Sequence, residues 1–164
     1  MTNNIYLTGF MGCGKSTIGF SLSKLTGKKF IDLDKFIVAE TGRSIEEIFE
    51  TDGEEFFRRI ETDALSKIAE MKNLVVALGG GTVLTEQNAE ICRKTGKTVF
   101  LQLSFETSYE RIKSSGRPLV VNHTKEELRG IFEQRLPLYT KHSSVHIDAD
   151  NSPFILAKEI KKRI

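Results

Sequence analysis

The sequence predicts an α/β protein in which a five-stranded parallel sheet is flanked by helices. Two observations lead to this fold class: short apolar runs alternate with longer helical stretches, and a glycine-rich loop follows the first apolar run. Such alternation favours a parallel sheet covered on both faces by right-handed crossovers, with ligands at the carboxyl ends of the strands. A chain of 164 residues can bury one core, so we expect a single domain over 1–164.

Each strand is predicted by a short run of apolar or β-branched residues. The five runs cover residues 5–8, 29–31, 74–78, 98–103 and 145–147. Helices are predicted from their end signals: Gly27 closes a helix over 15–26, and capping boxes, in which Ser or Thr precedes Glu by three residues, open helices at Ser44 and Thr124. Further helices are expected over 54–71, 85–94, 107–113 and from 153 to the end.

The balance of charge argues against a nucleic-acid partner. The chain carries 24 basic and 22 acidic side chains, so its formal charge is +2 and its field is weak. The first four residues lack the basic stretch of a signal peptide, and the apolar run 74–78 is too short to span a bilayer. Cys13 and Cys92 do not form a disulfide framework. We therefore expect a soluble, cytoplasmic monomer with reduced thiols and no membrane partner.

A phosphate-binding loop (P-loop) is predicted at residues 9–16, which fit the pattern G-x-x-x-x-G-K-[ST] after a strand and before a helix. Backbone N–H groups of such a loop point at phosphates, and the helix adds its positive N-terminal end. Lys15 is expected to reach the outer phosphates of a nucleotide, and Ser16 to offer its hydroxyl to Mg²⁺. A glycine-rich turn with an exposed lysine is the alternative. The predicted nucleotide-binding residues are Gly12, Cys13, Gly14, Lys15, Ser16 and Thr17.

Two acids, Asp32 and Asp34, follow the second predicted strand. In extended backbone, residues two apart point to the same side, so both carboxylates could face the P-loop. One acid could hold the magnesium shell while the other takes the proton of an acceptor hydroxyl, and Asp34 is our choice for the second role. The alternative is that both carboxylates cap a helix that starts near Lys35.

Three consecutive glycines, Gly79, Gly80 and Gly81, end the third predicted strand. Backbone without side chains permits close approach of a ligand and exposes its N–H groups. We interpret this segment as the floor of a second small-molecule site, with a plain tight turn as the alternative.

Three arginines are candidates for binding anionic groups, because a guanidinium forks onto carboxylate or phosphate. Alone, Arg58 and Arg135 could each be a solvated helix residue, with Glu61 as a surface partner of Arg58. Arg117 lies in the segment 114–118, which breaks the helical pattern and is predicted to be a mobile lid. From there it could reach the transferring phosphate. The histidines lack metal-ligand spacing and are interpreted as structural or exposed: His123, His142 and His146.

Taken together, these motifs closely resemble the shikimate kinase family along the whole chain. The resemblance is carried by residues 9–17, 32–34, 53–61, 79–81, 117–119 and 135–139. Single motifs are shared with other P-loop kinases, whereas the F-R-R-x-E helix, the triple glycine and the R-P-L lid in this order are specific. The resemblance implies a P-loop NTP hydrolase fold of the nucleoside-monophosphate-kinase-like type. It further implies a shikimate-binding region over 35–61 and a mobile lid over 112–124.

The resemblance also implies an activity: transfer of the γ-phosphate of MgATP to the 3-hydroxyl of shikimate, in aromatic amino acid biosynthesis. By resemblance, Asp34 activates the acceptor hydroxyl, with Lys15 and Arg117 as the other catalytic residues, while Ser16 and Asp32 organise magnesium. The implied shikimate-binding residues are Asp34, Arg58, Gly79, Gly80, Gly81 and Arg135, and Arg111 and Arg117 would contact the nucleotide.

One departure from the family pattern is visible near residues 151–153, where many members place a second arginine against the base and this chain has none. Two other functions stay open. A gluconate kinase would keep Lys15 and the lid but change the acceptor residues, and the Arg58 helix argues against it. A nucleotide-dependent switch would usually carry N-K-x-D and D-x-x-G motifs, and neither is found.

Overall fold

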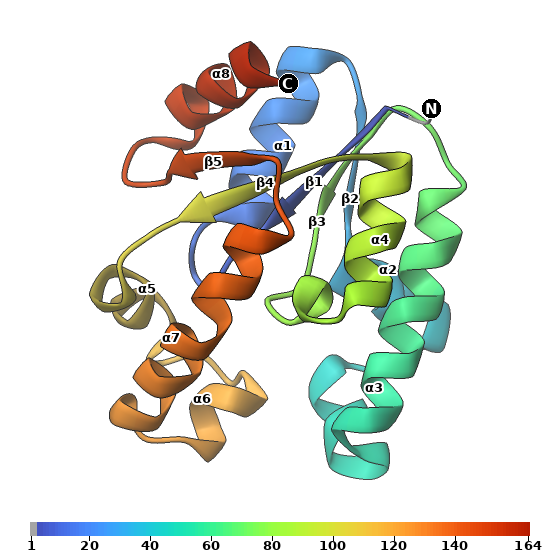
Figure 1. Cartoon of the computed structure of the whole chain (residues 1–164). Coiled ribbons are helices and arrows are strands. Elements are labelled where there is room, and N and C mark those ends of the chain that lie inside the picture. Colours follow the sequence, from blue (N-terminus) through green and yellow to red (C-terminus); the bar gives the residue numbers. More distant parts are fainter. Residues whose placement is uncertain (1–2) are drawn as a thin grey trace.

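The computed structural model describes residues 3–164 and contains one five-stranded, all-parallel sheet, as the sequence predicts (Figure 1). The strand order is β2-β3-β1-β4-β5. Met1 and Thr2, which belong to the predicted domain and to the segment searched for a signal peptide, lie outside the described residues. The strands are β1 (Asn4–Thr8), β2 (Lys29–Asp32), β3 (Leu74–Ala77), β4 (Gly96–Gln102) and β5 (Val145–Asp148).

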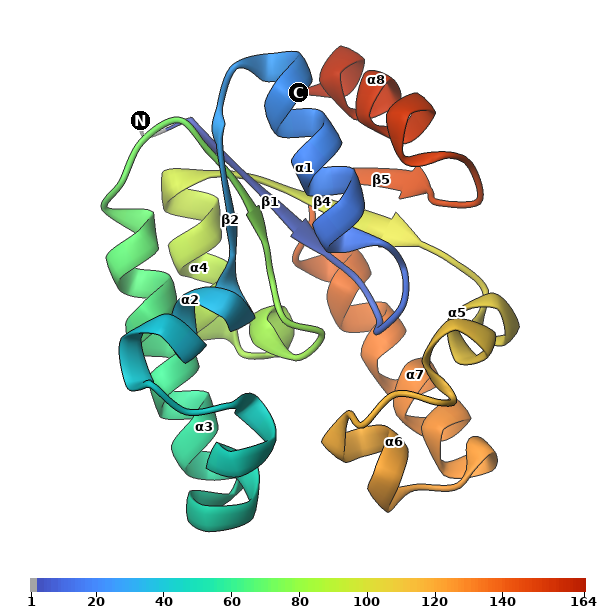
Figure 2. The same cartoon turned by 180° about the vertical axis from the view of Figure 1, so that it is seen from behind.

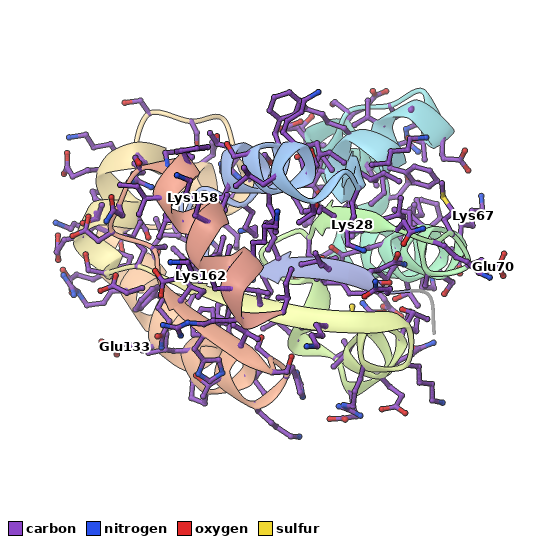
Figure 3. All side chains as sticks on the ribbon, turned by 90° about the horizontal axis from the view of Figure 1, so that it is seen from above. Lys28, Lys67, Glu70, Glu133, Lys158 and Lys162 are labelled. Carbon is purple, nitrogen blue, oxygen red and sulfur yellow. The ribbon has the colours of Figure 1, made fainter. Side chains whose placement is uncertain are left out.

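Helices cover both faces of the sheet, and two apolar cores result. Side chains of β1 alternate between them: Ile5 and Leu7 pack in the core under α1 (Lys15–Thr26) and α8 (Pro153–Arg163), whereas Tyr6 faces the other core. Figure 3 shows the strands from above, with α1 on one side of the sheet and α4 on the other, and the labelled Lys67 pointing outward. The helices of the second face are α3 (Ile45–Ala69), α4 (Glu86–Thr95) and α7 (Lys125–Lys141).

The remaining elements surround the carboxyl ends of the strands. They are α2 (Leu33–Thr41), the 3₁₀ helix η1 (Thr82–Leu84), α5 (Phe105–Ile112) and α6 (Pro118–Asn122). Figure 2 shows α2 and α3 on one side of these strand ends and α5, α6 and α7 on the other. Among residues 3–164, no helix is both long enough and apolar enough to cross a membrane.

The helices predicted at Ser44 and over 54–71 are both present: they meet within α3 at Gly53, whose non-helical φ of 85° and ψ of 173° kink the element. One local expectation needs correction. The backbone at Asp32 and Asp34 is not extended throughout, because Asp32 is the N-cap of α2 and Asp34 lies in its first turn. The alternation argument for the two carboxylates was therefore wrong, since the chain turns into a helix at Leu33.

Candidate active site

The loop between β1 and α1 has a backbone that only glycine adopts without strain. Gly9, Gly12 and Gly14 have φ values of 145°, 78° and 94°, in or near the left-handed region. Space is also short, because a Cβ on Gly9 would lie 2.8 Å from the carbonyl oxygen of Leu101. The glycines of the P-loop motif thus serve its geometry, and they bring the N-terminus of α1 to the carboxyl end of the sheet.

Lys15 and Ser16 begin α1 at the end of this loop. The Lys15 Nζ donates to the carbonyl oxygens of Gly9 at 2.8 Å and Phe10 at 3.0 Å, so the ammonium group lies across the loop. The Ser16 hydroxyl donates to Asp32 Oδ2 at 2.5 Å. Asp32 also accepts the Lys35 amide through Oδ1 at 3.2 Å, so it acts as the helix cap that the alternative interpretation expected.

The Ser16 and Asp32 oxygens could hold Mg²⁺. Hydroxyl and carboxylate oxygens are hard donors, and Mg²⁺ commonly binds through one or two protein groups together with phosphates and water. Among residues 3–164 there is no group of three or more His, Cys, Asp or Glu side chains placed to hold a metal. The donor set therefore fits a magnesium ion shared with a nucleotide rather than a site made by protein alone.

Asp34 lies in the first turn of α2 and lines a cavity of about 540 Å³. Burial, together with the negative charges of Asp32 and Glu61, raises its pKa from 3.8 to about 6, although Lys15 and Arg117 act in the lowering direction. An acid with a pKa near neutrality is suited to accept and release a proton.

The cavity brings together residues that are far apart in the sequence. Its wall contains residues of α2, α3, the glycine segment, the lid and α7. Of the residues predicted to bind the acceptor, all line it: Asp34, Arg58, Gly79, Gly80, Gly81 and Arg135. Apolar side chains complete the wall, among them Met11, Phe49 and Phe57.

Arg58 is held in place by acids on its own helix. Its Nη1 donates to Glu61 Oε1 at 2.9 Å, and its Nη2 lies 3.4 Å from Glu54 Oε1. Glu61 is only 1% exposed and also accepts the Thr82 hydroxyl at 2.8 Å. The interpretation of Arg58 and Glu61 as a solvated surface pair was wrong, because this pair lies at the cavity wall and Glu61 is buried and hydrogen-bonded to Thr82.

The glycine segment lies under this guanidinium. A Cβ on Gly81 would lie 2.5 Å from both terminal nitrogens of Arg58, and one on Gly79 would lie 2.9 Å from Glu61 Oε2. Side chains at these positions would displace the arginine and its anchoring acid, so the close packing favours the floor over a plain turn.

The lid region supplies another wall. Arg117, the N-cap of α6, lines the cavity together with Gly116, Pro118 and Leu119. Arg111 does not line the cavity: its Nη1 donates to the carbonyl oxygen of Gly12 in the P-loop at 3.0 Å. Cys13 and Cys92 are buried, free thiols.

Sequence reasoning missed several residues of the site. His123 was expected to be structural or exposed, yet it lines the cavity, with its Nδ1 2.9 Å from the carbonyl oxygen of Leu119. Thr82 was given no role in the site, and Glu61 was placed in the region 35–61 only as a surface partner of Arg58. An acid three residues after Arg58 was visible, but only burial distinguishes an anchor from a surface partner.

Comparisons with known proteins point to one family. A protein-family model described as shikimate kinase matches residues 11–164. A shikimate kinase from Streptococcus gordonii is 38% identical over 94% of this chain and 96% of its own length. One from Coxiella burnetii is 40% identical over 96% of this chain and 90% of its own length.

Solved structures give the same result. A shikimate kinase from Acinetobacter baumannii, in complex with shikimate, superposes with a TM-score of 0.94 at 36% identity, covering 99% of this chain and 93% of that one. A gluconokinase from Sinorhizobium meliloti reaches a TM-score of 0.59 at 16% identity, covering 96% of this chain and 89% of that one, which indicates a shared fold alone.

Proposed function

Because the chain belongs to the shikimate kinase family, we propose that shikimate binds in the cavity beside the P-loop and that the residues lining it carry out the reaction. The enzyme transfers the γ-phosphate of its co-substrate ATP to the 3-hydroxyl of shikimate, giving shikimate 3-phosphate and ADP. The observation that carries the residue roles is the convergence of one buried acid, two arginines and a glycine floor on a single cavity.

Arg58 and Arg135 bind the carboxylate of shikimate in this proposal. Both line the cavity, and Arg135 Nη1 lies 3.7 Å from the position of a Cβ on Gly80, so it borders the floor. Two guanidinium groups at one end of a cavity can grip a carboxylate with paired hydrogen bonds. The N–H groups of the segment from Gly79 to Gly81 supply further donors to the substrate.

Asp34 accepts the proton of the 3-hydroxyl as its oxygen attacks the γ-phosphorus. The new bond forms between that oxygen and phosphorus, and the bond from phosphorus to the β-γ bridging oxygen breaks, so the electron pair leaves with ADP. A pKa of about 6 keeps most of the Asp34 carboxyl ionised at neutral pH while making it more basic than an ordinary aspartate.

Lys15 and Arg117 stabilise the charge on the transferring phosphoryl group. Lys15 exchanges its two carbonyl partners for phosphate oxygens, and Arg117 approaches from the lid. We assign the nucleotide phosphates to the loop and first helical turn, and the base to the side of Arg111. The phosphate-binding residues are Gly12, Cys13, Gly14, Lys15, Ser16 and Thr17.

Ser16 and Asp32 are proposed to hold Mg²⁺, which when bound offsets negative charge on the β- and γ-phosphates. Their short hydrogen bond keeps both oxygens at the edge of the P-loop before a nucleotide arrives. This arrangement lowers the cost of organising the site, since neither side chain has to be brought from elsewhere.

The organisation of the chain is proposed as one domain over 1–164, with a shikimate-binding region over 35–61 and a lid over 112–124. The single sheet of residues 3–164 and the position of both segments at the cavity support this division. We further propose a monomer without nucleic-acid or membrane partners, in keeping with the near-neutral charge of +2. Two free cysteines fit a reducing cytoplasm.

The function is tested by measuring ADP release with shikimate, with gluconate and with no acceptor. We expect rapid release only with shikimate, because the arginines and floor select an acid of its shape and the lid excludes water as an acceptor. Equal rates in all three reactions would reject the assignment. Mass spectrometry of the product should show one added phosphoryl group on shikimate.

A further inference from the structure

One face of α7 reaches the segment that forms the floor of the cavity. Arg135, Tyr139 and His142 follow one another at intervals of four and three residues, so they lie along the same side of the helix. Arg135 borders Gly80, as described above. The other two are deeply placed, since Tyr139 is 0% and His142 is 8% exposed, and neither side chain lines the cavity.

The carbonyl oxygens of the floor, and those of the next two residues, Thr82 and Val83, all accept hydrogen bonds from other protein groups. Gly80 O accepts from the Tyr139 hydroxyl at 2.5 Å, and Val83 O lies 2.6 Å from His142 Nδ1. Asn88 Nδ2 donates to Thr82 O at 2.8 Å. The carbonyl oxygens of Gly79 and Gly81 accept from the amides of Thr82 and Leu84, at 3.2 and 3.3 Å.

The amide N–H groups of Gly80 and Gly81 differ from these carbonyl oxygens, because within residues 3–164 neither amide donates a hydrogen bond. A trans peptide places its C=O and its N–H on opposite sides, and the described chain has no cis peptide. Fixing the carbonyl oxygen of Gly80 on α7 therefore directs the N–H of Gly81 away from α7. Unpaired amides at a cavity wall are donors that a ligand can satisfy.

Tyr139 is suited to this task by its surroundings. Its ring packs against Phe100 with the ring centroids 5.3 Å apart. Burial raises the pKa of Tyr139 to about 12, although the neighbouring Arg135 acts in the lowering direction, so the hydroxyl keeps its proton at neutral pH and acts as a donor to the carbonyl.

We propose that Tyr139 is a positioning residue for the acceptor substrate: it holds the Gly80 peptide so that the floor N–H groups stay free for shikimate, and His142 supports the same segment at Val83. Neither residue touches the substrate. The inference rests on the proposed placement of shikimate in this cavity and extends it to α7, a helix that follows the lid directly in the chain.

The test compares Tyr139→Phe with Tyr6→Phe. Tyr6 is a matched control, because it too is fully buried and its hydroxyl pairs with Thr95 Oγ1 at 2.7 Å, outside the cavity wall. We expect Tyr139→Phe to raise the KM for shikimate about 5- to 30-fold, the range that one buried hydrogen bond controls, and the KM for ATP less than about twofold. Tyr6→Phe should change neither KM, although both variants lose stability.

A second pair of variants guards against misfolding of Tyr139→Phe. His142→Leu removes the donor to the Val83 carbonyl oxygen and should raise the KM for shikimate. His142→Asn keeps a side-chain donor near the place of Nδ1, so its KM for shikimate should lie much closer to the wild-type value. An unchanged shikimate KM in both Tyr139→Phe and His142→Leu would overturn the inference. So would a parallel rise in the KM for ATP. Wild-type protein assayed alongside separates this result from failure of the proposed function, which would appear as no shikimate-dependent ADP release at all.

Discussion

The environment of Asp34 suits the proton transfer proposed for it and has a cost in stability. Its folded-state pKa of about 6 lies above the ordinary 3.8, so ionising it is harder in the folded protein than in the unfolded chain. The folded state therefore binds the proton more tightly, and this carboxyl lowers stability as pH rises from 3.8 toward 6. Above pH 6 the whole penalty is present.

Replacing Asp34 by Asn should separate these effects. We expect Asp34→Asn to lower kcat at least about 10²-fold, because the proton acceptor is lost, while ATP binding is retained. At pH 8 the variant should be more stable than wild type by up to about 3 kcal/mol, and this gain should shrink as pH falls below 6. Urea denaturation at pH 8 and pH 4 measures it. Near-normal kcat in Asp34→Asn would remove Asp34 from the mechanism. The control variant is Asp63→Asn, which changes an exposed acid of α3 in the same way.

Glu61 is the buried acid that orients the Arg58 guanidinium. Glu61→Gln removes the negative charge while keeping the shape, so Arg58 loses its closest ionic partner at 2.9 Å. We expect the KM for shikimate to rise about tenfold or more and the free energy of unfolding to fall by about 2 kcal/mol. Steady-state kinetics and urea denaturation test this. Glu55→Gln, on the exposed face of the same helix, should change stability by less than about 0.5 kcal/mol, and an equal effect in both variants would contradict the role of Glu61.

The bend in α3 decides which of its side chains reach the site. Gly53 has φ 85° and ψ 173°, a conformation that is essentially restricted to glycine. Beyond it, Glu54, Phe57 and Arg58 line the cavity. The sequence predicted a helical segment on each side of Gly53 but not the angle between them.

Gly53→Ala tests the bend directly. A Cβ at Gly53 would meet nothing within 4 Å, so the expected loss is backbone strain alone, about 1–3 kcal/mol of unfolding free energy. The KM for shikimate should rise as well, because Arg58 follows the bend. Gly130→Ala is the matched control: Gly130 lies inside α7 with equally open space, and alanine there should stabilise the protein by about 0.5–1 kcal/mol. Thermal and urea unfolding distinguish these opposite signs.

The strands were predicted to within two residues, with a clear physical reason. In a parallel sheet covered on both faces, the strands are short, nearly continuous apolar runs, and these stand out between helical stretches. The Asp32–Asp34 argument failed for a different reason. It assumed that the strand continued past Asp32, whereas the side chain of that residue caps a new helix.

The folded chain couples Arg117, in the segment proposed as a lid, to Asp34, the proposed proton acceptor. Arg117 is distant from Asp34 in the sequence, yet its positive charge acts to lower the pKa of that carboxyl. The pKa of Asp34 also responds to Asp32 at the end of β2, to Glu61 of α3 and to Lys15 of α1, so charged groups from four segments set one titration.

Arg117→Ala should therefore move the pH profile. In wild type, kcat/KM for shikimate should fall as pH drops through about 6, because protonated Asp34 cannot accept the hydroxyl proton. Without Arg117 the pKa of Asp34 rises, so the acid limb should shift to higher pH, in addition to a lower kcat from the lost phosphate contact. Arg163→Ala at the C-terminal helix is the control and should leave the profile in place. An unshifted limb in Arg117→Ala would contradict the coupling.

Local patterns were enough for the P-loop, the five strands, the membership of the family and the set of residues expected to bind the acceptor, since each is encoded by neighbouring residues or by a recognisable order of motifs. The burial of Glu61, the bend at Gly53, the cavity position of His123 and the hold of Tyr139 on Gly80 required the folded chain. Burial and distance between remote segments arise from packing, and an arginine beside a glutamate has the same sequence whether the pair is solvated or enclosed.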